Sequence, residues 1–202
     1  MSEARAAGCT VVLFHSALGL RPAVRDFADR LRAAGHTAHT PDLYDGELFD
    51  DLPSGMKKVE ALGGISALMQ RTQAAVADLP TDVVYAGFSN GGASAEMLAA
   101  TRPGARGAVL MHAALPLQAF GAESWPRTVP VQIHYADRDP LRDQKNVDAL
   151  AASVRQSGAR LELYDYRADG HLFADADSPD YDRAAAELMT RRVLDFLERV
   201  SA

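Results

Sequence analysis

Short apolar runs alternate along this chain of 202 residues with longer Ala-, Leu- and Arg-rich stretches that have helical spacing. Most of the short runs are continuously apolar, which is typical of parallel strands covered on both faces. In Val24–Ala34, apolar side chains recur at i, i+3, i+4 and i+7, and Gly35 follows as a helix stop. The expected strands are Thr10–Phe14, Thr37–Thr40, Asp82–Ala86, Ala108–Met111, Val129–Tyr135 and Leu161–Tyr166, and the expected helices are Val24–Ala34, Lys57–Ala77, Gly91–Thr101, Gln144–Gln156 and Tyr181–Val200.

This order of elements predicts an α/β fold, with a doubly wound, mostly parallel sheet of about six strands and helices on both faces. No repeat, linker or low-complexity tract interrupts the alternation, and no insertion is long enough for a lid domain. We therefore expect a single domain over residues 1–202, which is long enough to bury a sizeable core. In such a sheet, ligands bind beyond the carboxyl ends of the strands, so the residues that follow each strand are the candidates for chemistry.

Composition excludes several classes of function. With 21 Lys and Arg against 27 Asp and Glu, the net charge of −6 argues against a nucleic-acid partner, which would need a basic face. The lone Cys9 excludes a disulfide framework and a multi-thiolate metal site. The apolar run at Val11–Phe14 is too short for a signal peptide, and no stretch approaches the roughly 18 apolar residues of a membrane span. We expect a cytoplasmic protein with no membrane partner.

A strand-to-helix turn carries the strongest chemical signal. After the apolar run Val83–Ala86 the chain reads Gly87-Phe88-Ser89-Asn90-Gly91-Gly92, a G-x-S-x-G pattern that opens a helix. This context is typical of a nucleophile elbow, in which a sharp turn projects the serine hydroxyl above the sheet. The glycines leave room for the turn, and the helix N-terminus offers free N–H groups to a developing oxyanion. A phosphate-binding turn is disfavoured, because no Lys follows as a P-loop requires.

A serine hydroxyl needs an adjacent base that is oriented by a third group. In this type of fold the partners follow in the order Ser, acid, His. His171, after the last predicted strand, is the expected base for Ser89; His15, His36, His39, His112 and His134 occupy less suitable places in the chain. The spacing leaves the acid open, because Asp137 and Asp139 share the preceding loop and Asp169 lies beside the histidine.

Several segments together resemble the dienelactone hydrolases of the α/β-hydrolase superfamily, and the resemblance covers nearly the whole chain. They include Val12–Gly19, Pro41-Asp42-Leu43-Tyr44, the glycine-rich elbow, Ala136–Pro140 and Gly170-His171-Leu172-Phe173. The resemblance implies a minimal α/β-hydrolase fold and selects Asp139 as the acid. It also implies that the backbone N–H groups of Ala17 and Asn90 form the oxyanion hole.

Three positions depart from the pattern of the founding members of that family. Ser89 stands where they have a nucleophilic Cys, Ser16 where they have a Glu near the thiol, and Asp175 where they have an Arg that holds a substrate carboxylate. A serine must lose its proton to His171 during attack, and a nearby carboxylate would disfavour that loss. An Asp at position 175 would repel an anionic lactone, so these departures favour a neutral or cationic ester.

The expected function is hydrolysis of a small carboxylic ester or lactone through an acyl-enzyme on Ser89, without a metal or an organic cofactor. Alternatives are a thioesterase or another acyl hydrolase with the same triad, and a non-catalytic binding protein of this fold. We expect a monomer or homodimer. The expected pocket residues are Ser16, Leu18, Phe120 and Trp125, from the loop after the first strand and from the loop Leu115–Pro126; Tyr44–Met56 is a further candidate wall.

Overall fold

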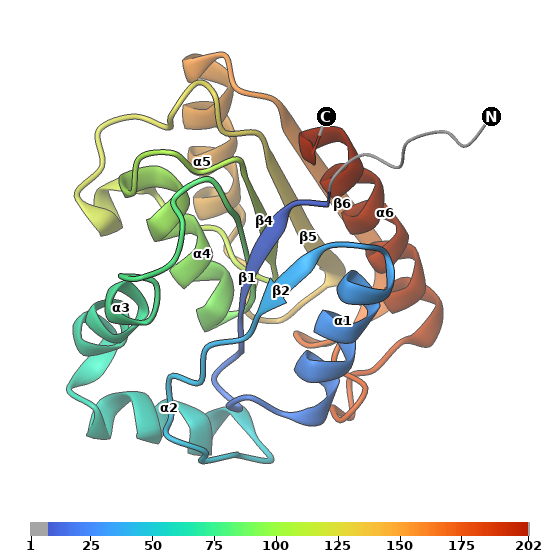
Figure 1. Ribbon diagram of the computed structural model, residues 1–202. Helices are drawn as coiled ribbons and strands as arrows, with labels where there is room; N and C mark the ends of the chain where they lie inside the picture. The colour runs from blue at the N-terminus through green and yellow to red at the C-terminus, as the bar shows by residue number, and fades with distance from the viewer. Residues whose placement is uncertain (1–7, 202) are drawn as a thin grey trace.

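A computed structural model describes residues 8–201, in which six strands form one sheet (Figure 1). All strand pairs are parallel, and the spatial order is β2-β1-β3-β4-β5-β6. The chain winds outward from β1 to β2 and then in the opposite direction from β3, so the topological switch lies between β1 and β3. The strands are β1 (Thr10–Phe14), β2 (Thr37–His39), β3 (Val84–Phe88), β4 (Gly107–Met111), β5 (Val131–Arg138) and β6 (Leu161–Asp169).

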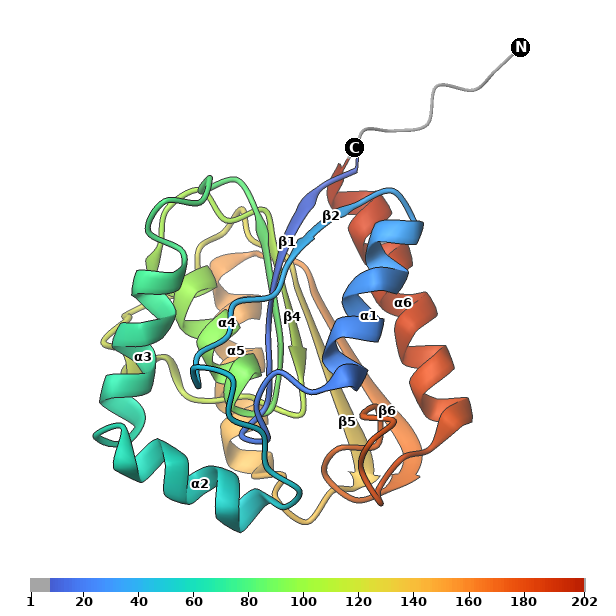
Figure 2. The same ribbon diagram turned by 60° about the horizontal axis from the view of Figure 1, so that its bottom comes forward.

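Helices cover both faces of the sheet, which confirms the predicted fold class. Figure 2 shows α1 and α6 on one face and α3, α4 and α5 on the other, with α2 next to α3. Gly55 of α2 packs against Ala17 in the segment that follows β1. A short 3₁₀ helix spans Leu117–Phe120. The α-helices are α1 (Pro22–Ala33), α2 (Leu52–Ala61), α3 (Gly64–Ala75), α4 (Asn90–Thr101), α5 (Gln144–Ser157) and α6 (Arg183–Ser201).

The continuous apolar runs follow from burial of both faces of the sheet. In β1, Val12 and Phe14 belong to the apolar cluster under α3, α4 and α5, whereas Val11 and Leu13 belong to the cluster under α1 and α6. All four side chains are fully buried. Because successive side chains of a strand point to opposite faces, a strand between two helix layers needs apolar residues at every position.

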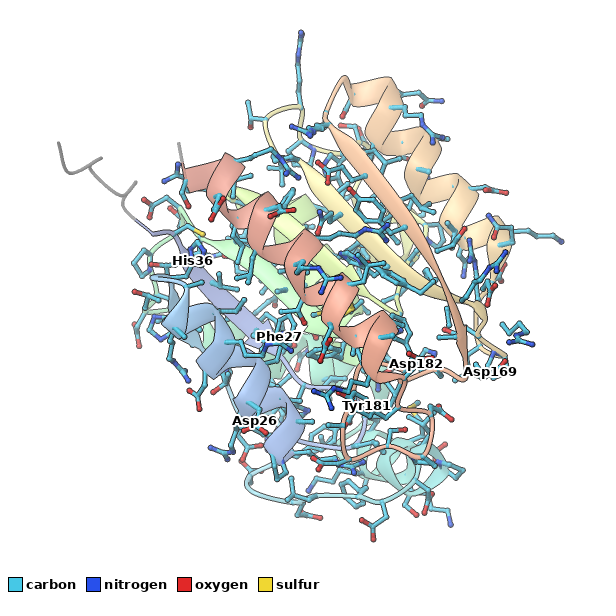
Figure 3. The ribbon with its side chains drawn as sticks, turned by 90° about the vertical axis from the view of Figure 1, so that its right-hand side faces the viewer. Asp26, Phe27, His36, Asp169, Tyr181 and Asp182 are labelled. Carbon is cyan, nitrogen blue, oxygen red and sulfur yellow. The ribbon has the colours of Figure 1, made fainter. Side chains whose placement is uncertain are left out.

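The face under α1 and α6 is closed by aromatic packing. Figure 3 shows the two helices side by side over the sheet, with Phe27 on α1 and Asp182 at the start of α6. The Phe27 ring meets the Phe88 ring edge to face, with 5.4 Å between their centroids. The Asp182 carboxylate accepts the N–H of Ala185, which caps the first turn of α6. Among residues 8–201, no helix combines the length and apolar character needed to cross a bilayer.

The predicted helix Lys57–Ala77 is wrong, because the chain forms two helices there. Gly63 and Gly64 have φ angles of 106° and 84°, in the left-handed region that ends α2 and starts α3. The first of the two helices also begins earlier than expected, since Asp51 caps it by accepting the N–H of Ser54 at 2.7 Å. The pair of adjacent glycines was the sequence signal for this break.

The strands that carry the acid and base loops are longer than predicted. β5 extends to Arg138 and pairs with Asp169 of β6 through an irregularity between Ala136 and Arg138. Asp137 therefore lies within the bulged end of β5, and Asp139 is the first residue beyond the strand. The bulge changes the direction of the strand end, a common device for re-aiming side chains near functional sites.

Candidate active site

Ser89 lies in a strained turn between β3 and α4. Its φ of 53° and ψ of −116° place it outside the conformations that L-residues commonly adopt. The turn is held by the Ser89 N–H, which donates to the Met111 carbonyl of β4 at 2.7 Å, and by the Ser89 carbonyl, which accepts from Ala93 at 3.0 Å. The predicted elbow is therefore present in the backbone, at the carboxyl edge of the sheet beside the topological switch.

Two glycines allow this turn to form. A Cβ at Gly87 would lie 2.0 Å from the Gly91 carbonyl oxygen. A Cβ at Gly91 would lie 2.4 Å from the carbonyl oxygens of both His15 and Phe14. These distances leave no room for any side chain, since real Cβ contacts are much longer. The start of α4 consequently packs directly against the backbone that leaves β1.

Ser89, His171 and Asp139 form one hydrogen-bonded chain. Ser89 Oγ lies 2.8 Å from His171 Nε2, and His171 Nδ1 lies 2.8 Å from Asp139 Oδ2 and 3.0 Å from Oδ1. An ionised carboxylate only accepts, so Nδ1 carries the imidazole proton and Nε2 accepts from the serine hydroxyl. The imidazole and the carboxylate are both buried, which strengthens the interaction between them.

The other two acid candidates lie elsewhere. Asp137 and Asp169 are exposed, and their carboxylates face Arg138, at 4.0 Å and 2.7 Å from its Nε. Asp139 also accepts the N–H of Leu141 at 2.8 Å, which fixes its carboxylate in the turn after β5. The geometry thus separates the three candidates that spacing alone left open.

Asp180 holds the histidine loop in place, and the sequence reasoning missed it. Its Oδ2 accepts the N–H of His171 at 2.9 Å and that of Leu172 at 3.2 Å. Gly170 has a φ of 81°, and a Cβ there would lie 2.2 Å from the Asp180 carboxyl carbon. No local pattern marks a carboxylate nine residues downstream as the anchor of this loop.

The backbone N–H groups of Ala17 and Asn90 have no acceptor within residues 8–201. Asn90 is the first residue of α4, so its N–H points out of the helix N-terminus. Ala17 follows β1 and is buried, with its carbonyl against α2, where a Cβ at Gly55 would lie 2.1 Å from it. Unused amides from the two strands at the topological switch therefore face the same edge of the sheet.

A hollow of about 210 Å³ lies beside Ser89. Apart from Ser89 and His171, its lining comes mostly from the segment after β4 and from the start of α5. In the described part of the chain, no Lys or Arg lines it. The remaining lining residues are Asn90, Ala93, His112, Ala113, Ala114, Leu115, Tyr135, Leu141, Asp143 and Asn146.

Two buried ionisable groups lie at this hollow, since Tyr135 lines it and Glu96 contacts the lining residue Leu115. Burial and the nearby Asp139 carboxylate raise the pKa of Tyr135, so its phenol stays protonated. Burial also raises the pKa of Glu96 well above its ordinary range, while its Oε2 accepts the N–H of Leu115 at 3.0 Å. Sequence reasoning missed Glu96, because a glutamate on a helix is ordinarily a surface residue.

The expected pocket residues do not line this hollow. Trp125 is fully buried, and its indole N–H donates to the Val129 carbonyl at 2.7 Å, so it is part of the core. Phe120 packs against the same apolar cluster. Leu18 is buried and donates its N–H to Ser16 Oγ at 3.2 Å. A bulky apolar side chain on a loop fills the core as readily as a pocket, which is why composition could not separate the two.

Ser16 and Asp175 line a second, much smaller crevice of about 10 Å³ on the α1 side. The Asp175 carboxylate is buried and lies 4.0 Å from an Arg21 guanidinium nitrogen. Burial raises the pKa of Asp175. Asp175 therefore lies in a crevice separate from the hollow beside Ser89, with a cation nearby.

His112 and His134 are both buried near the site, and neither joins the hydrogen-bonded chain. His134 contacts the Tyr166 hydroxyl and the Gln132 side chain, at 2.8 Å and 2.9 Å. Burial lowers the pKa of His134 to about 3. Burial likewise lowers the pKa of His112 well below its ordinary value. In the described residues, no cluster of three His, Cys, Asp or Glu side chains could hold a metal ion.

Comparison with known proteins gives a consistent result. The family model described as "Dienelactone hydrolase family" matches residues 2–201. A protein of Escherichia coli (strain K12) named "Putative carboxymethylenebutenolidase" is 24% identical over 94% of this chain and 76% of its own length.

Solved structures show the same fold. A dienelactone hydrolase-like promiscuous phosphotriesterase from metagenomic libraries superposes with a TM-score of 0.78 at 22% identity, covering 95% of this chain and 86% of that one. A thermophilic esterase from the Planctomycetes species Thermogutta terrifontis, with propionate bound, superposes with a TM-score of 0.61 at 16% identity, covering 98% of this chain and 85% of that one.

Proposed function

Because this chain belongs to the dienelactone hydrolase family and is a hydrolase of that family, we propose that it cleaves small carboxylic esters or lactones through an acyl-enzyme on Ser89. The observation that carries the proposal is the unbroken chain of hydrogen bonds from Ser89 through His171 to Asp139. A hydroxyl in a strained turn, bonded to an oriented imidazole, is the arrangement that activates a serine for attack on a carbonyl.

In the first half of the proposed reaction, Ser89 Oγ attacks the carbonyl carbon while His171 Nε2 takes the hydroxyl proton. Asp139 holds the proton on Nδ1 and stabilises the imidazolium that forms. The carbonyl oxygen becomes an oxyanion, which accepts from the N–H groups of Ala17 and Asn90. When the tetrahedral intermediate collapses, His171 gives its proton to the leaving alkoxide, and the acyl group remains on Ser89.

In the second half, water attacks the acyl-enzyme. His171 Nε2 takes one proton from the water as its oxygen bonds to the acyl carbon, and the same two N–H groups receive the second oxyanion. Collapse releases the carboxylic acid, and His171 returns the proton to Ser89 Oγ. No step requires a group other than substrate, water and these residues.

The larger hollow favours uncharged substrates. Among the described residues that line it, Asp143 carries the only carboxylate, and no Lys or Arg is present to receive a substrate carboxylate. Ala113, Ala114, Leu115 and Leu141 offer an apolar surface to an acyl or alcohol group. We therefore propose a neutral ester or lactone as substrate, in preference to an anionic lactone.

Covalent labelling tests this proposal directly. A fluorophosphonate should label the wild-type protein on Ser89, block hydrolysis of p-nitrophenyl acetate, and leave Ser89→Ala unlabelled. Iodoacetamide should leave activity unchanged, since the lone Cys9 is buried at the start of β1. Label on another residue, or full activity in Ser89→Ala, would show that the nucleophile is wrong.

A substrate panel then defines the acyl group. Neutral esters, lactones and thioesters of matched chain length should be compared with carboxylate-bearing lactones. We expect the neutral oxygen esters or lactones to have the highest kcat/KM. A higher value for thioesters would assign a thioesterase, and tight binding without turnover of any compound would favour a non-catalytic role.

A further inference from the structure

His15 occupies a fully buried position directly after β1 and makes two hydrogen bonds to backbone. Its Nδ1 lies 2.7 Å from the Ser16 carbonyl oxygen, and its Nε2 lies 3.0 Å from the N of Leu43. The Tyr44 ring packs edge-on against the imidazole, with 4.7 Å between centroids. The imidazole therefore ties the loop after β1 to the loop after β2.

These two contacts require the same tautomer of His15. A carbonyl oxygen only accepts, so Nδ1 must carry a proton; a backbone N–H only donates, so Nε2 must be unprotonated. Burial lowers the pKa of His15, which keeps the ring neutral even though the Asp42 carboxylate lies 3.9 Å from Nε2. Both bonds are thus present in one stable form of the side chain.

The Ser16 carbonyl and the Ala17 N–H are the two ends of a single peptide group. Because that group is planar, a bond that fixes the direction of its oxygen also fixes the direction of its N–H. The Gly19 N–H donates to the same carbonyl at 3.2 Å, which closes the turn. Donors on a carbonyl also polarise the amide and make its own N–H a stronger donor.

The opposite wall of the site gives this peptide a fixed neighbour. Gly91, the second residue of α4, packs against the carbonyl oxygens of His15 and Phe14 with no space for a side chain. The two amides assigned to the oxyanion, at positions 17 and 90, therefore belong to backbone segments in direct contact. A small rotation of the Ser16–Ala17 peptide would misalign one of the two donors.

We propose that His15 is a positioning residue for hydrolysis, which acts through its Nδ1–H on the Ser16 carbonyl to aim the Ala17 N–H at the developing oxyanion. This inference rests on the proposed function of Ser89. In this proposal His15 does not contact the substrate. The hydrogen bond at Nε2 only holds the ring in place, and the effect on catalysis comes from the hydrogen bond at Nδ1.

Two substitutions separate the two nitrogens. The amide nitrogen of Asn occupies nearly the place of Nδ1, so His15→Asn retains a donor for the Ser16 carbonyl and loses the acceptor for Leu43. His15→Gln does the reverse, because its amide oxygen reaches the place of Nε2. Each variant loses one hydrogen bond, so their thermal stabilities should be similar, whereas only His15→Gln loses the bond that aims the peptide.

We expect His15→Gln to lower kcat for p-nitrophenyl acetate by about 10- to 100-fold with KM little changed, since outright loss of one oxyanion donor costs on the order of 10²–10³. His15→Asn should stay within about threefold of wild type. A trifluoromethyl ketone, whose adduct carries an oxyanion, should have a Ki that rises in His15→Gln in parallel with the loss in kcat/KM.

His134→Gln is the matched control. It also alters a buried histidine that makes two hydrogen bonds, and this histidine lies away from the β1 loop. It should lower stability and leave the Ki of the ketone unchanged. Equal kcat in His15→Gln and His15→Asn, or losses that follow melting temperature across all three variants, would overturn the positioning role. Failure of the hydrolase itself would show differently, as an inactive wild type or an active Ser89→Ala.

Discussion

The neighbouring strands β3 and β4 are each followed by a residue with a positive φ angle, yet the two side chains have different surroundings. Ser89 after β3 has a φ of 53°, and His112 after β4 has a φ of 61°. The Ser89 hydroxyl is bonded to His171, whereas neither ring nitrogen of His112 has a partner within residues 8–201. The centroids of the His112 and His171 rings are only 5.6 Å apart.

The difference comes from what each turn packs against. The Ser89 turn leads through two glycines into α4 and opens on the hollow. The His112 side chain also borders the hollow, but its buried ring packs among aromatic side chains, stacked 6.2 Å from Phe88 and edge-on 4.8 Å from Phe173. A strained turn therefore fixes where a side chain points, and the partners it meets there decide whether the group can do chemistry.

Substituting the side chain at each of these two turns in separate variants gives the largest expected difference in kcat. Ser89→Ala should lower kcat for p-nitrophenyl acetate by on the order of 10⁶, because removing the nucleophile leaves only binding and the oxyanion donors. His112→Phe should lower it by less than about tenfold, since the ring bonds to nothing and Phe has a similar shape. Steady-state kinetics on both purified variants measures the contrast. A loss in His112→Phe close to that in Ser89→Ala would remove the distinction between the two turns.

Substitution of the proposed acid, Asp139, gives the next largest effect and tests the hydrogen-bonded chain that begins at Ser89. Asp139→Asn should lower kcat by about 10⁴, because an amide can hold the imidazole in the wrong tautomer. Asp137→Asn, two residues earlier on the exposed side of the β5 bulge, should stay within about threefold. The ratio of the two turnover numbers is the measurement. If Asp137→Asn is the more damaged variant, the acid has been assigned to the wrong residue.

The smallest expected effect is on the free energy of unfolding, and it tests the burial of His112 in the turn after β4. Burial first, and then the charges of His171 and His134, lower the pKa of His112 well below its ordinary value. As pH falls below about 6.5, the unfolded chain takes up a proton that the folded protein does not, so folding weakens by up to about 1.4 kcal/mol per pH unit.

His112→Phe removes this contribution. Between pH 6.5 and 5 the wild type should lose up to about 2 kcal/mol more unfolding free energy than the variant, measured by urea titration at each pH. Above pH 7.5 the two pH dependences should run parallel, because the histidine is then neutral in both states. If the unfolding free energies of the two proteins differ by the same amount at every pH, burial does not keep His112 neutral.

The residues of the hydrogen-bonded chain could be predicted because they are carried by local patterns in a fixed order along the chain. Ser89 sits in a glycine-rich turn, and His171 follows the last strand, so the periodicity that located the strands located these residues too. Asp139 needed more than spacing, since the β5 bulge that excludes Asp137 is a tertiary feature.

Other parts of the site could not be predicted, because they depend on contacts across long stretches of sequence. Asp180 bonds to amides eight and nine residues upstream, and Glu96 is buried on α4 against a loop nineteen residues away. Nothing in their immediate neighbours sets them apart from surface carboxylates. Trp125 shows the reverse error, since a large aromatic residue on a loop turned out to fill the core.

The Asp180 carboxylate provides a way to measure, without any substrate, whether the loop that carries His171 is in place. It binds the amide hydrogens of His171 and Leu172 together, so those hydrogens can exchange with heavy water only when the loop that carries the imidazole detaches. Their exchange rates therefore report how often the loop that carries the proposed base detaches in the resting protein. The same loop would be released by any side chain at Gly170, since even a methyl group would occupy the space of that carboxylate.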